Sequence, residues 1–361
     1  MKRLYASVMC VSMAILAAEM GVIRQMSVTN SASFAAMIIS IALLGFGISG
    51  TIITVRREAV LRRLDLLMYL SAALFTLCAG YLFTAAGSIE FVPQSLHEDP
   101  SQIARIGAYY IVFFLPFFFA SLFINLSFLK ATGSIGRLYF FNLAGSGIGA
   151  LAILLLMSTI DPQNLLLPVV ILMTVPLALS CPRGRKWYAA SAAVVLLALI
   201  PFIKGLSLEL SPYKDISYAS KAPDAKIVKT MPSPTGFVQV MESGQFRFAP
   251  GLSLSFYDVE TPNQLGLFID GSSASGIAHE VSGAQADYIA KLPFAAPFIV
   301  KPRPAVLILG AGGGNPVLYA KHLGASTITA VEPDAHLVSM IRSSFADYSR
   351  GVWDAPNVET V

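Results

Sequence analysis

The chain has 361 residues, of which 55% are hydrophobic and 13% are charged, and its formal net charge is +4. Soluble domains carry about 25% charged residues, so this composition excludes a wholly soluble globular protein. Basic residues are spread over separate loops instead of forming one patch, and we therefore expect no nucleic-acid partner.

The deficit in charge lies before about residue 204, where apolar runs reach the length needed to cross a bilayer, about 20 residues each. The sequence predicts a multi-pass helical bundle over residues 1–204, in a cell (inner) membrane, with the lipid bilayer as its partner. The expected spans are Leu4–Ile23, Ser33–Val55, Leu66–Ala86, Ile106–Leu129, Leu138–Ile160, Asn164–Ser180 and Trp187–Ile203. The last two are the shortest and contain prolines, which makes them the weakest of the seven.

Two features stand out within the spans. Glu19 lies in the first span with Arg24 near its end. A carboxylate in lipid is costly, so Glu19 should face the bundle interior and have a partner. It is expected either to form a polar, substrate-handling site or to be a structural ion pair or interface residue. In the fifth span, Gly145 and Gly149 form a G-x-x-x-G pattern that predicts close helix packing.

The loops between the spans indicate an orientation. Basic residues recur in alternate loops, at Lys2 and Arg3, Arg56 to Arg63, Lys130 and Arg137, and Arg183 to Lys186. The positive-inside rule therefore places the N-terminus in the cytoplasm. The cysteines, Cys10, Cys78 and Cys181, have no metal-like spacing, and neither a metal site nor a disulfide framework is expected.

From about residue 205 the chain becomes more polar, with short alternating runs separated by glycine and proline. This pattern is typical of strands and hairpins, and it predicts a β-rich module with a linker helix over residues 205–296. The helix is expected at Asp287 to Pro297, directly before an apolar strand.

The last segment, residues 297–361, carries the most specific motif. The apolar run Ala305 to Leu309 leads into four glycines in five residues, Gly310, Gly312, Gly313 and Gly314, and then Asn315 and Pro316. Asn315 is expected to cap a helix and Pro316 to begin it, which places backbone N–H groups around the turn. A second apolar run ends in Glu332, about 20 residues on, where a carboxylate can accept hydrogen bonds from a ribose diol.

This order of strand, glycine turn, helix, strand and acid predicts the N-terminal part of an α/β Rossmann-like nucleotide-cofactor domain. Asn315 stands where a dinucleotide fingerprint has its third glycine, which favours S-adenosylmethionine-type cofactors over NAD. The alternative is a glycine turn in an α/β domain that binds nothing.

The combination of parts resembles the spermidine synthase (polyamine aminopropyltransferase) superfamily, in its bacterial membrane-fused branch. The matching elements are Ser211-Pro-Tyr213, Phe268-Ile-Asp-Gly271, Tyr288 with Leu292-Pro293, Val306 to Gly314, Val331-Glu-Pro-Asp334 and Phe345 to Asp354. The resemblance implies a domain that binds S-adenosylmethionine or its decarboxylated form, with the glycine turn at the sulfonium end and Glu332 at the ribose. Asp270 and Tyr288 are then candidates on the substrate side, with a small-molecule amine or another acceptor as the partner.

The sequence also departs from that family. Asn315 replaces the aspartate that follows the family's glycines, and Ile289 and Ala290 replace the His-Glu that follows the tyrosine. The family's catalytic aspartate would lie beyond Val361, so we expect a fragment or an incomplete domain whose catalytic residues remain unknown.

Three functions are therefore weighed: a membrane-bound aminopropyl transferase, a methyltransferase that acts on another acceptor, and a non-enzymatic transporter or sensor with a ligand-binding domain. The cofactor chemistry favours a cytoplasmic domain. Seven spans from a cytoplasmic N-terminus would instead place it outside.

Overall fold

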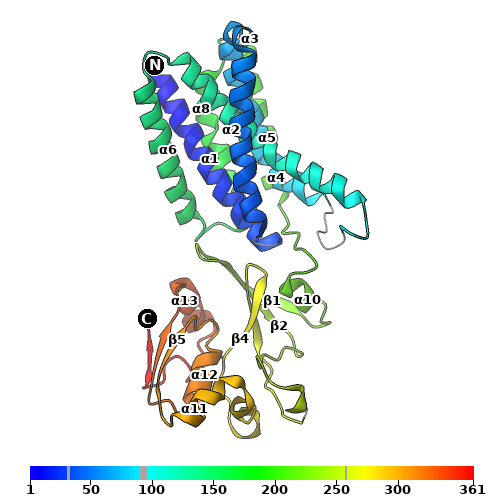
Figure 1. Ribbon diagram of the computed structural model, residues 1–361, viewed down its shortest axis with the longest axis vertical. Helices are drawn as coiled ribbons and strands as arrows, with labels where there is room; N and C mark the ends of the chain where they lie inside the picture. The colour runs from blue at the N-terminus through cyan, green and yellow to red at the C-terminus, as the bar shows by residue number, and fades with distance from the viewer. Residues whose placement is uncertain (31–32, 90–95, 257) are drawn as a thin grey trace. The chain divides into compact units, whose positions relative to one another are not determined.

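The computed structural model describes residues 1–30, 33–89, 96–256 and 258–361. These residues form two compact units, Met1–Ser211 and Pro212–Val361. The first unit is a bundle of long helices and the second contains two small sheets (Figure 1). The β-rich part and the glycine-rich part, which the sequence analysis divided near residue 296, share one hydrophobic core within the second unit.

The first unit is helical along almost all of its described length. Its helices are α1 (Lys2–Thr29), α2 (Ser33–Val55), α3 (Arg57–Arg62), α4 (Leu64–Gly87), α5 (Ser101–Lys130), α6 (Ile135–Leu156), α7 (Leu167–Leu172), α8 (Thr174–Ser180) and α9 (Arg185–Lys204). Among the described residues, seven stretches are long and apolar enough to cross a membrane, and each overlaps one of the seven predicted spans. These stretches are those of a membrane protein.

The bundle departs from the prediction at two spans. The fifth was expected to reach Ile160, but α6 ends at Leu156 and turns follow it. The sixth is not one continuous helix: it consists of a short 3₁₀ turn at Pro162–Asn164 followed by α7 and α8. Pro168 falls at the start of α7, where a missing backbone N–H costs little.

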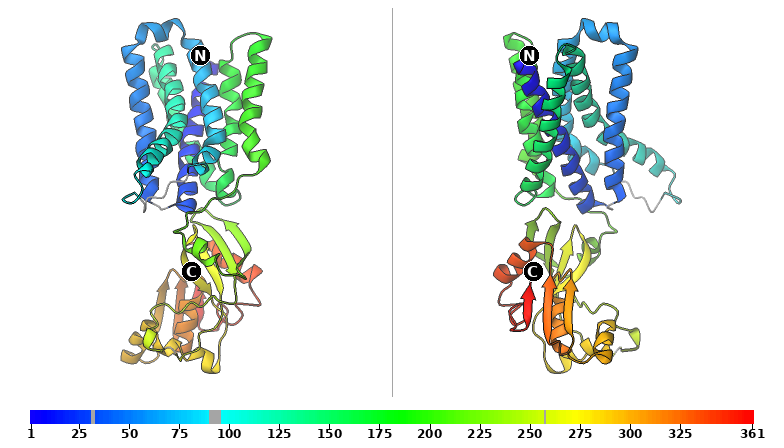
Figure 2. Two further views of the ribbon diagram at one scale, coloured as in Figure 1. Left: turned by 90° about the vertical axis from the view of Figure 1, so that its right-hand side faces the viewer. Right: turned by 60° about the vertical axis from the view of Figure 1, so that its left-hand side comes forward.

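The core of the bundle is centred on α1, which packs along α6 and also contacts α2, α5 and α8 (Figure 2). A Cβ atom added at Gly145 would lie 2.3 Å from the carbonyl oxygen of Met9, and one added at Gly149 would lie 2.4 Å from that of Met13. Since real side chains cannot approach so closely, only glycine permits this contact between the α1 and α6 backbones. The close packing predicted from the G-x-x-x-G pattern is confirmed.

The second unit begins with α10 (Asp215–Ala219) and a four-stranded antiparallel sheet in the order β1-β2-β3-β4. Its strands are β1 (Lys226–Pro232), β2 (Phe237–Glu242), β3 (Leu265–Ile269) and β4 (Ser272–Ile277). Strands β3 and β4 form a hairpin in which Ile269 pairs with Ser272 across Asp270 and Gly271. Both turn residues have positive φ, 52° and 67°, as a two-residue primed turn requires.

A three-stranded parallel sheet follows, in the order β5-β6-β7. It consists of β5 (Ala305–Leu309), α12 (Asn315–His322), β6 (Thr327–Val331), α13 (Ala335–Ser344) and β7 (Val358–Thr360). Ile308, Ile328 and Ala330 belong to the same buried core as the apolar residues of the two helices. Leu307 and Leu309 alternate with Ile308 and are 63% and 75% exposed, so the opposite face of β5 is open.

Two local predictions in this unit are wrong. The expected helix from Asp287 to Pro297 is instead a series of 3₁₀ turns at Gly283–Ala286, Ile289–Lys291 and Pro293–Ala295, followed by the short α11 (Ala296–Val300). Pro293 and Pro297 interrupt the hydrogen-bond ladder that a continuous helix would need. The cap of α12 is Gly314, with φ 94°, and Asn315 is the first residue of that helix instead of its cap.

Candidate functional site

The glycine turn, residues 310–314, lies between the end of β5 and the start of α12. Gly310 and Gly312 have φ of 74° and 54°, a left-handed conformation that glycine adopts at no steric cost. The N–H groups of Gly310 and Ala311 donate to the carbonyl oxygen of Val331, at 2.9 and 3.2 Å. The turn is thereby anchored to the carboxyl end of the neighbouring strand β6, the edge at which parallel α/β sheets bind ligands.

One half of the turn is open. A Cβ atom added at Gly310 or at Gly312 would meet no atom within 4 Å. Gly310 itself is exposed and Gly312 is half-buried. A ligand could therefore approach the backbone of these two residues directly.

The other half of the turn is closed by the rest of the unit. A Cβ atom at Gly313 would lie 2.1 Å from the carbonyl oxygen of Gly276, and one at Gly314 would lie 2.7 Å from Nε1 of Trp353. The Gly313 carbonyl accepts a 2.8 Å hydrogen bond from the N–H of Ala278. These two glycines have a packing role, whereas the sequence analysis assigned all four to the cofactor.

Glu332 lies at the end of β6, beside the open half. Its Oε2 atom accepts the Gly312 N–H at 2.8 Å, and its Oε1 atom accepts the Asp334 N–H at 3.1 Å. A carboxylate has about four acceptor positions, so each oxygen keeps capacity for a further donor such as a sugar hydroxyl. The structure thus brings together three of the predicted residues, Gly310, Gly312 and Glu332.

Asp334 fixes the segment that follows Glu332. Its Oδ1 atom accepts from the N–H groups of His336 and Leu337 and caps α13, while its Oδ2 atom accepts the Thr235 hydroxyl at 2.6 Å. Asp334 is 7% exposed, and both of its carboxylate oxygens accept hydrogen bonds from the protein, so it holds the loop after β6 in place.

Asp270 does not lie beside the glycine turn. It occupies the β3–β4 hairpin, where its Oδ1 atom accepts the Phe237 N–H at 2.8 Å and its carbonyl oxygen accepts from Lys214 Nζ at 2.8 Å. Strand β4 reaches the turn at the other end, where Ile277 is bridged to Gly314. At about 3.3 Å per residue, the length of β4 separates the hairpin from the turn by roughly 17 Å.

Tyr288 is fully buried and forms part of the core of the unit. Its ring meets that of Tyr319 edge-on, with centroids 6.0 Å apart. Burial raises the pKa of the Tyr288 phenol above its ordinary value. In this structure the predicted substrate-side tyrosine has no solvent-accessible surface from which to meet a substrate.

The residues that sequence reasoning missed are those that close the turn. Gln264 and Asn315 are buried and exchange side-chain hydrogen bonds of 3.1 and 3.3 Å, which join the start of β3 to the start of α12. Trp353 is 2% exposed, and its Nε1 atom has no hydrogen-bond partner among the described residues. The contact of Gln264 with Asn315 and that of Trp353 with Gly314 each join segments far apart in sequence, so no local pattern indicates them.

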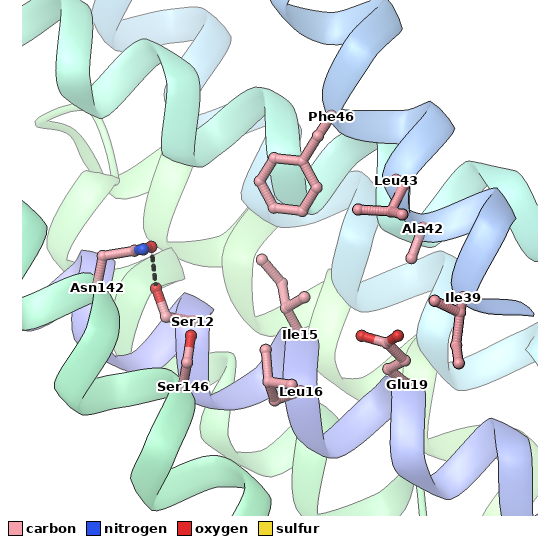
Figure 3. A pocket seen from close by; sticks show the side chains of 10 residues that line it. All are labelled: Ser12, Ile15, Leu16, Glu19, Ile39, Ala42, Leu43, Phe46, Asn142 and Ser146. Atoms are coloured by element: carbon pink, nitrogen blue, oxygen red, sulfur yellow. Dashed lines mark hydrogen bonds between the residues drawn. The ribbon is translucent and has the colours of Figure 1, made fainter.

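Glu19 and Arg24 occupy the first unit and form a separate candidate site. Glu19 lines a pocket between α1, α2 and α6 (Figure 3). Both residues are described, yet no ion pair joins them, and Glu19 has no hydrogen bond or ion pair to any described residue. The structural ion pair between these two residues, one of the alternatives that the sequence left open, does not form.

No protein-family model matches the chain, and searches of curated proteins and of solved structures also find no match. The part of the chain that the structure describes has seven apolar stretches that can cross a membrane, and a second unit with a half-open glycine turn beside an acid.

Proposed function

We propose that the second unit binds a nucleoside cofactor of the S-adenosylmethionine type at the open half of the glycine turn. The observation that carries the proposal is the empty space over Gly310 and Gly312 next to the oriented carboxylate of Glu332. In a Rossmann-like arrangement, a nucleoside bound at this edge has its ribose near the acid that ends the second strand.

Gly310, Gly312 and Glu332 fit a nucleoside cofactor of this type. Backbone without a Cβ atom allows the sulfonium side of the cofactor to approach closely, and the Glu332 oxygens retain acceptor capacity for two ribose hydroxyls. The carboxylate is already held by two backbone N–H groups, so it loses little conformational freedom when a ligand binds.

When bound, a sulfonium cofactor supplies an activated carbon for transfer to a nucleophile. The chain's own part is to bind and orient the nucleoside. On this basis we propose a membrane-bound, spermidine synthase-like transferase that uses S-adenosylmethionine or its decarboxylated form. An amine acceptor must be neutral to attack, and a carboxylate that orients it would take its proton.

A methyltransferase with another acceptor uses the same cofactor site, and the two reactions differ in product. Aminopropyl transfer leaves methylthioadenosine, whereas methyl transfer leaves S-adenosylhomocysteine. Incubating the full chain with each cofactor and candidate acceptors, and then identifying the nucleoside product, separates the two.

The third candidate, a transporter or sensor, is supported by the pocket around Glu19 within the bundle. It predicts that solute movement or binding persists when Gly312 and Glu332 are altered. The proposed transferase predicts that product formation is lost with the same substitutions.

Isothermal titration of the full chain against S-adenosylmethionine, decarboxylated S-adenosylmethionine and NAD tests the cofactor proposal. We expect binding of at least one sulfonium compound and none of NAD. Binding of NAD alone would overturn the proposal.

The cofactor proposal implies that the second unit lies in the cytoplasm, where S-adenosylmethionine is made. Reporter enzymes fused after Val361 test this placement. Activity of a reporter that works only in an oxidising compartment would contradict it and support the orientation derived from seven spans and a cytoplasmic N-terminus.

A further inference from the structure

The pocket in the first unit combines one acidic side chain with an otherwise apolar or neutral lining. It has a volume of about 130 Å³ and is lined by Ser12, Ile15, Leu16 and Glu19 of α1, Ile39, Ala42, Leu43 and Phe46 of α2, and Asn142 and Ser146 of α6. Glu19 is the only ionisable side chain among these lining residues. It lies in the second half of the 28-residue helix α1, more than two helical turns from either end.

The pocket is polar at both ends and apolar between them. At one end, the Ser12 hydroxyl donates to Oδ1 of Asn142 at 2.8 Å, with Ser146 nearby. At the other end, the Glu19 carboxylate rises from α1 towards Leu43, beside Ile15 (Figure 3). Ser12 and Glu19 are seven residues apart on one helix, which corresponds to about 10 Å along its axis.

The charge of Glu19 has no counter-ion among the described residues. An ionised carboxylate within a membrane-spanning helix is costly unless it is paired. A ligand that carries a positive charge would remove this cost, and an anionic or neutral ligand would not. When Glu19 is ionised, the electrostatics of the pocket therefore favour a cation over an anion or a neutral molecule.

The apolar lining and the volume restrict the kind of cation. A cavity of about 150 Å³ in another protein is sufficient for benzene, a molecule of six heavy atoms. The pocket therefore has room for an ammonium group and a chain of about five carbons, with the chain against Ile15, Leu16 and Leu43. Leu43 and Ile39 are 67% and 46% exposed, so the pocket wall formed by α2 reaches the apolar outer surface of the bundle.

We propose that this pocket is a binding site for a small primary alkylammonium ion, with Glu19 as its counter-ion. The site is independent of the cofactor proposal, because its residues all belong to the first unit and none belongs to the glycine turn. Failure of one proposal therefore leaves the other standing.

The test uses the full chain in lipid nanodiscs, with empty nanodiscs subtracted, and pentylammonium as the probe. Binding is measured by saturation-transfer NMR and by competition. The neutral analogue 1-pentanol separates charge recognition from apolar partition. We expect pentylammonium to bind at least tenfold more tightly than 1-pentanol.

Glu19→Gln keeps the size of the side chain and removes its charge, and it should reduce pentylammonium binding at least tenfold. Glu58→Gln is the matched control, because Glu58 lies in the same unit and its side chain is 90% exposed. We expect no change in that variant. Equal binding by the parent chain and Glu19→Gln, or equal binding of the amine and the alcohol, would overturn the proposal.

A second variant guards against a folding defect in Glu19→Gln. Leu43→Trp fills the pocket from α2 while the Glu19 charge remains, and the partly exposed position tolerates a larger side chain. Loss of pentylammonium binding in Leu43→Trp, with an unchanged unfolding temperature, would support the pocket as the binding site. Full binding in this variant would place the ammonium elsewhere and refute the assignment.

Discussion

The backbone N–H of Gly312 donates to Oε2 of Glu332 at 2.8 Å, so the open half of the glycine turn and the acid at the end of β6 are directly joined. Through its other oxygen, Glu332 also holds the N–H of Asp334. The acid therefore organises the turn before any ligand binds. A substitution at Glu332 will affect both the shape of the turn and its chemistry, and the two effects must be separated.

Replacing Glu332 by alanine removes both of these hydrogen bonds and the acceptor for the ribose. We expect cofactor affinity to fall by about 1–3 kcal/mol, the usual cost of losing a hydrogen bond to a charged group. Glu332→Gln retains one carbonyl oxygen and should lose less. Isothermal titration gives the affinities, and unfolding temperatures report the structural part. Unchanged affinity in the alanine variant would mean that Glu332 does not contact the cofactor.

Replacing Gly310 by alanine should weaken cofactor binding more than it weakens folding. Its φ of 74° makes any Cβ atom somewhat unfavourable, by about 1–2 kcal/mol, but the space around it is free. Gly324 is the matched control, because it has φ of 81° and equally free space in the same unit. Both variants should lose similar stability, and only Gly310→Ala should lose binding. Equal loss of binding in the two would argue against a ligand at the turn.

The sequence predicts the glycine turn and its acid, but it does not predict which glycines are open. The motif concerns only residues near one another in the chain, and it correctly places a turn between β5 and α12. Whether a glycine faces solvent depends on the docking of Gly276 and Trp353, which lie about 40 residues away on either side. That docking is a tertiary contact, and local spacing contains no information about it.

The buried pair Gln264 and Asn315 offers a test of that docking. Replacing either residue by an apolar one leaves the partner amide buried without its hydrogen bonds, which should cost about 1–3 kcal/mol in the free energy of unfolding. The double variant Gln264→Met, Asn315→Leu removes both amides and should be less destabilised than the sum of the single variants. Denaturant unfolding in a double-mutant cycle measures the difference. Strict additivity would indicate that the two amides do not interact.

The spans of the first unit could be predicted because apolar length and composition alone define them. The prolines mark the sixth span as weak, but the exact breaks within it and the end of α6 could not be predicted, since they depend on local hydrogen bonds. The helix expected at Asp287 to Pro297 was wrong for a related reason. Its apolar residues suit a helix, but Pro293 and Pro297 divide the segment into single turns.

The contact between α1 and α6 gives a sharp comparison between neighbouring glycines. Gly149→Ala places a Cβ atom 2.4 Å from the Met13 carbonyl oxygen and should destabilise the bundle by about 1–3 kcal/mol, the usual cost of overpacking. Gly147, on the same helix, has no atom within 4 Å of an added Cβ, so Gly147→Ala should be neutral or slightly stabilising. Thermal unfolding in detergent compares the two. Equal stability of both variants would contradict the described packing of the helices.

His279 should make the second unit less stable in mild acid. Burial lowers the pKa of its imidazole below the ordinary value, and its Nδ1 atom has no hydrogen-bond partner among the described residues. The unfolded chain, with a pKa of about 6.5, therefore binds this proton more readily than the folded chain does. The stability that the neutral imidazole contributes to the folded state is fully present above about pH 6.5. It is lost as the pH falls towards the lower, folded-state pKa.

His279→Phe keeps an aromatic ring against Tyr348, whose ring centroid lies 5.0 Å from that of the histidine, and removes the titration. Between about pH 7.5 and about pH 5.5 this variant should lose less stability than the parent chain. His336, which is exposed at the start of α13, supplies the control, and His336→Phe should follow the parent. Denaturant unfolding of the full chain at the two pH values measures all three. If His279→Phe loses as much stability as the parent, the imidazole is not the group that titrates.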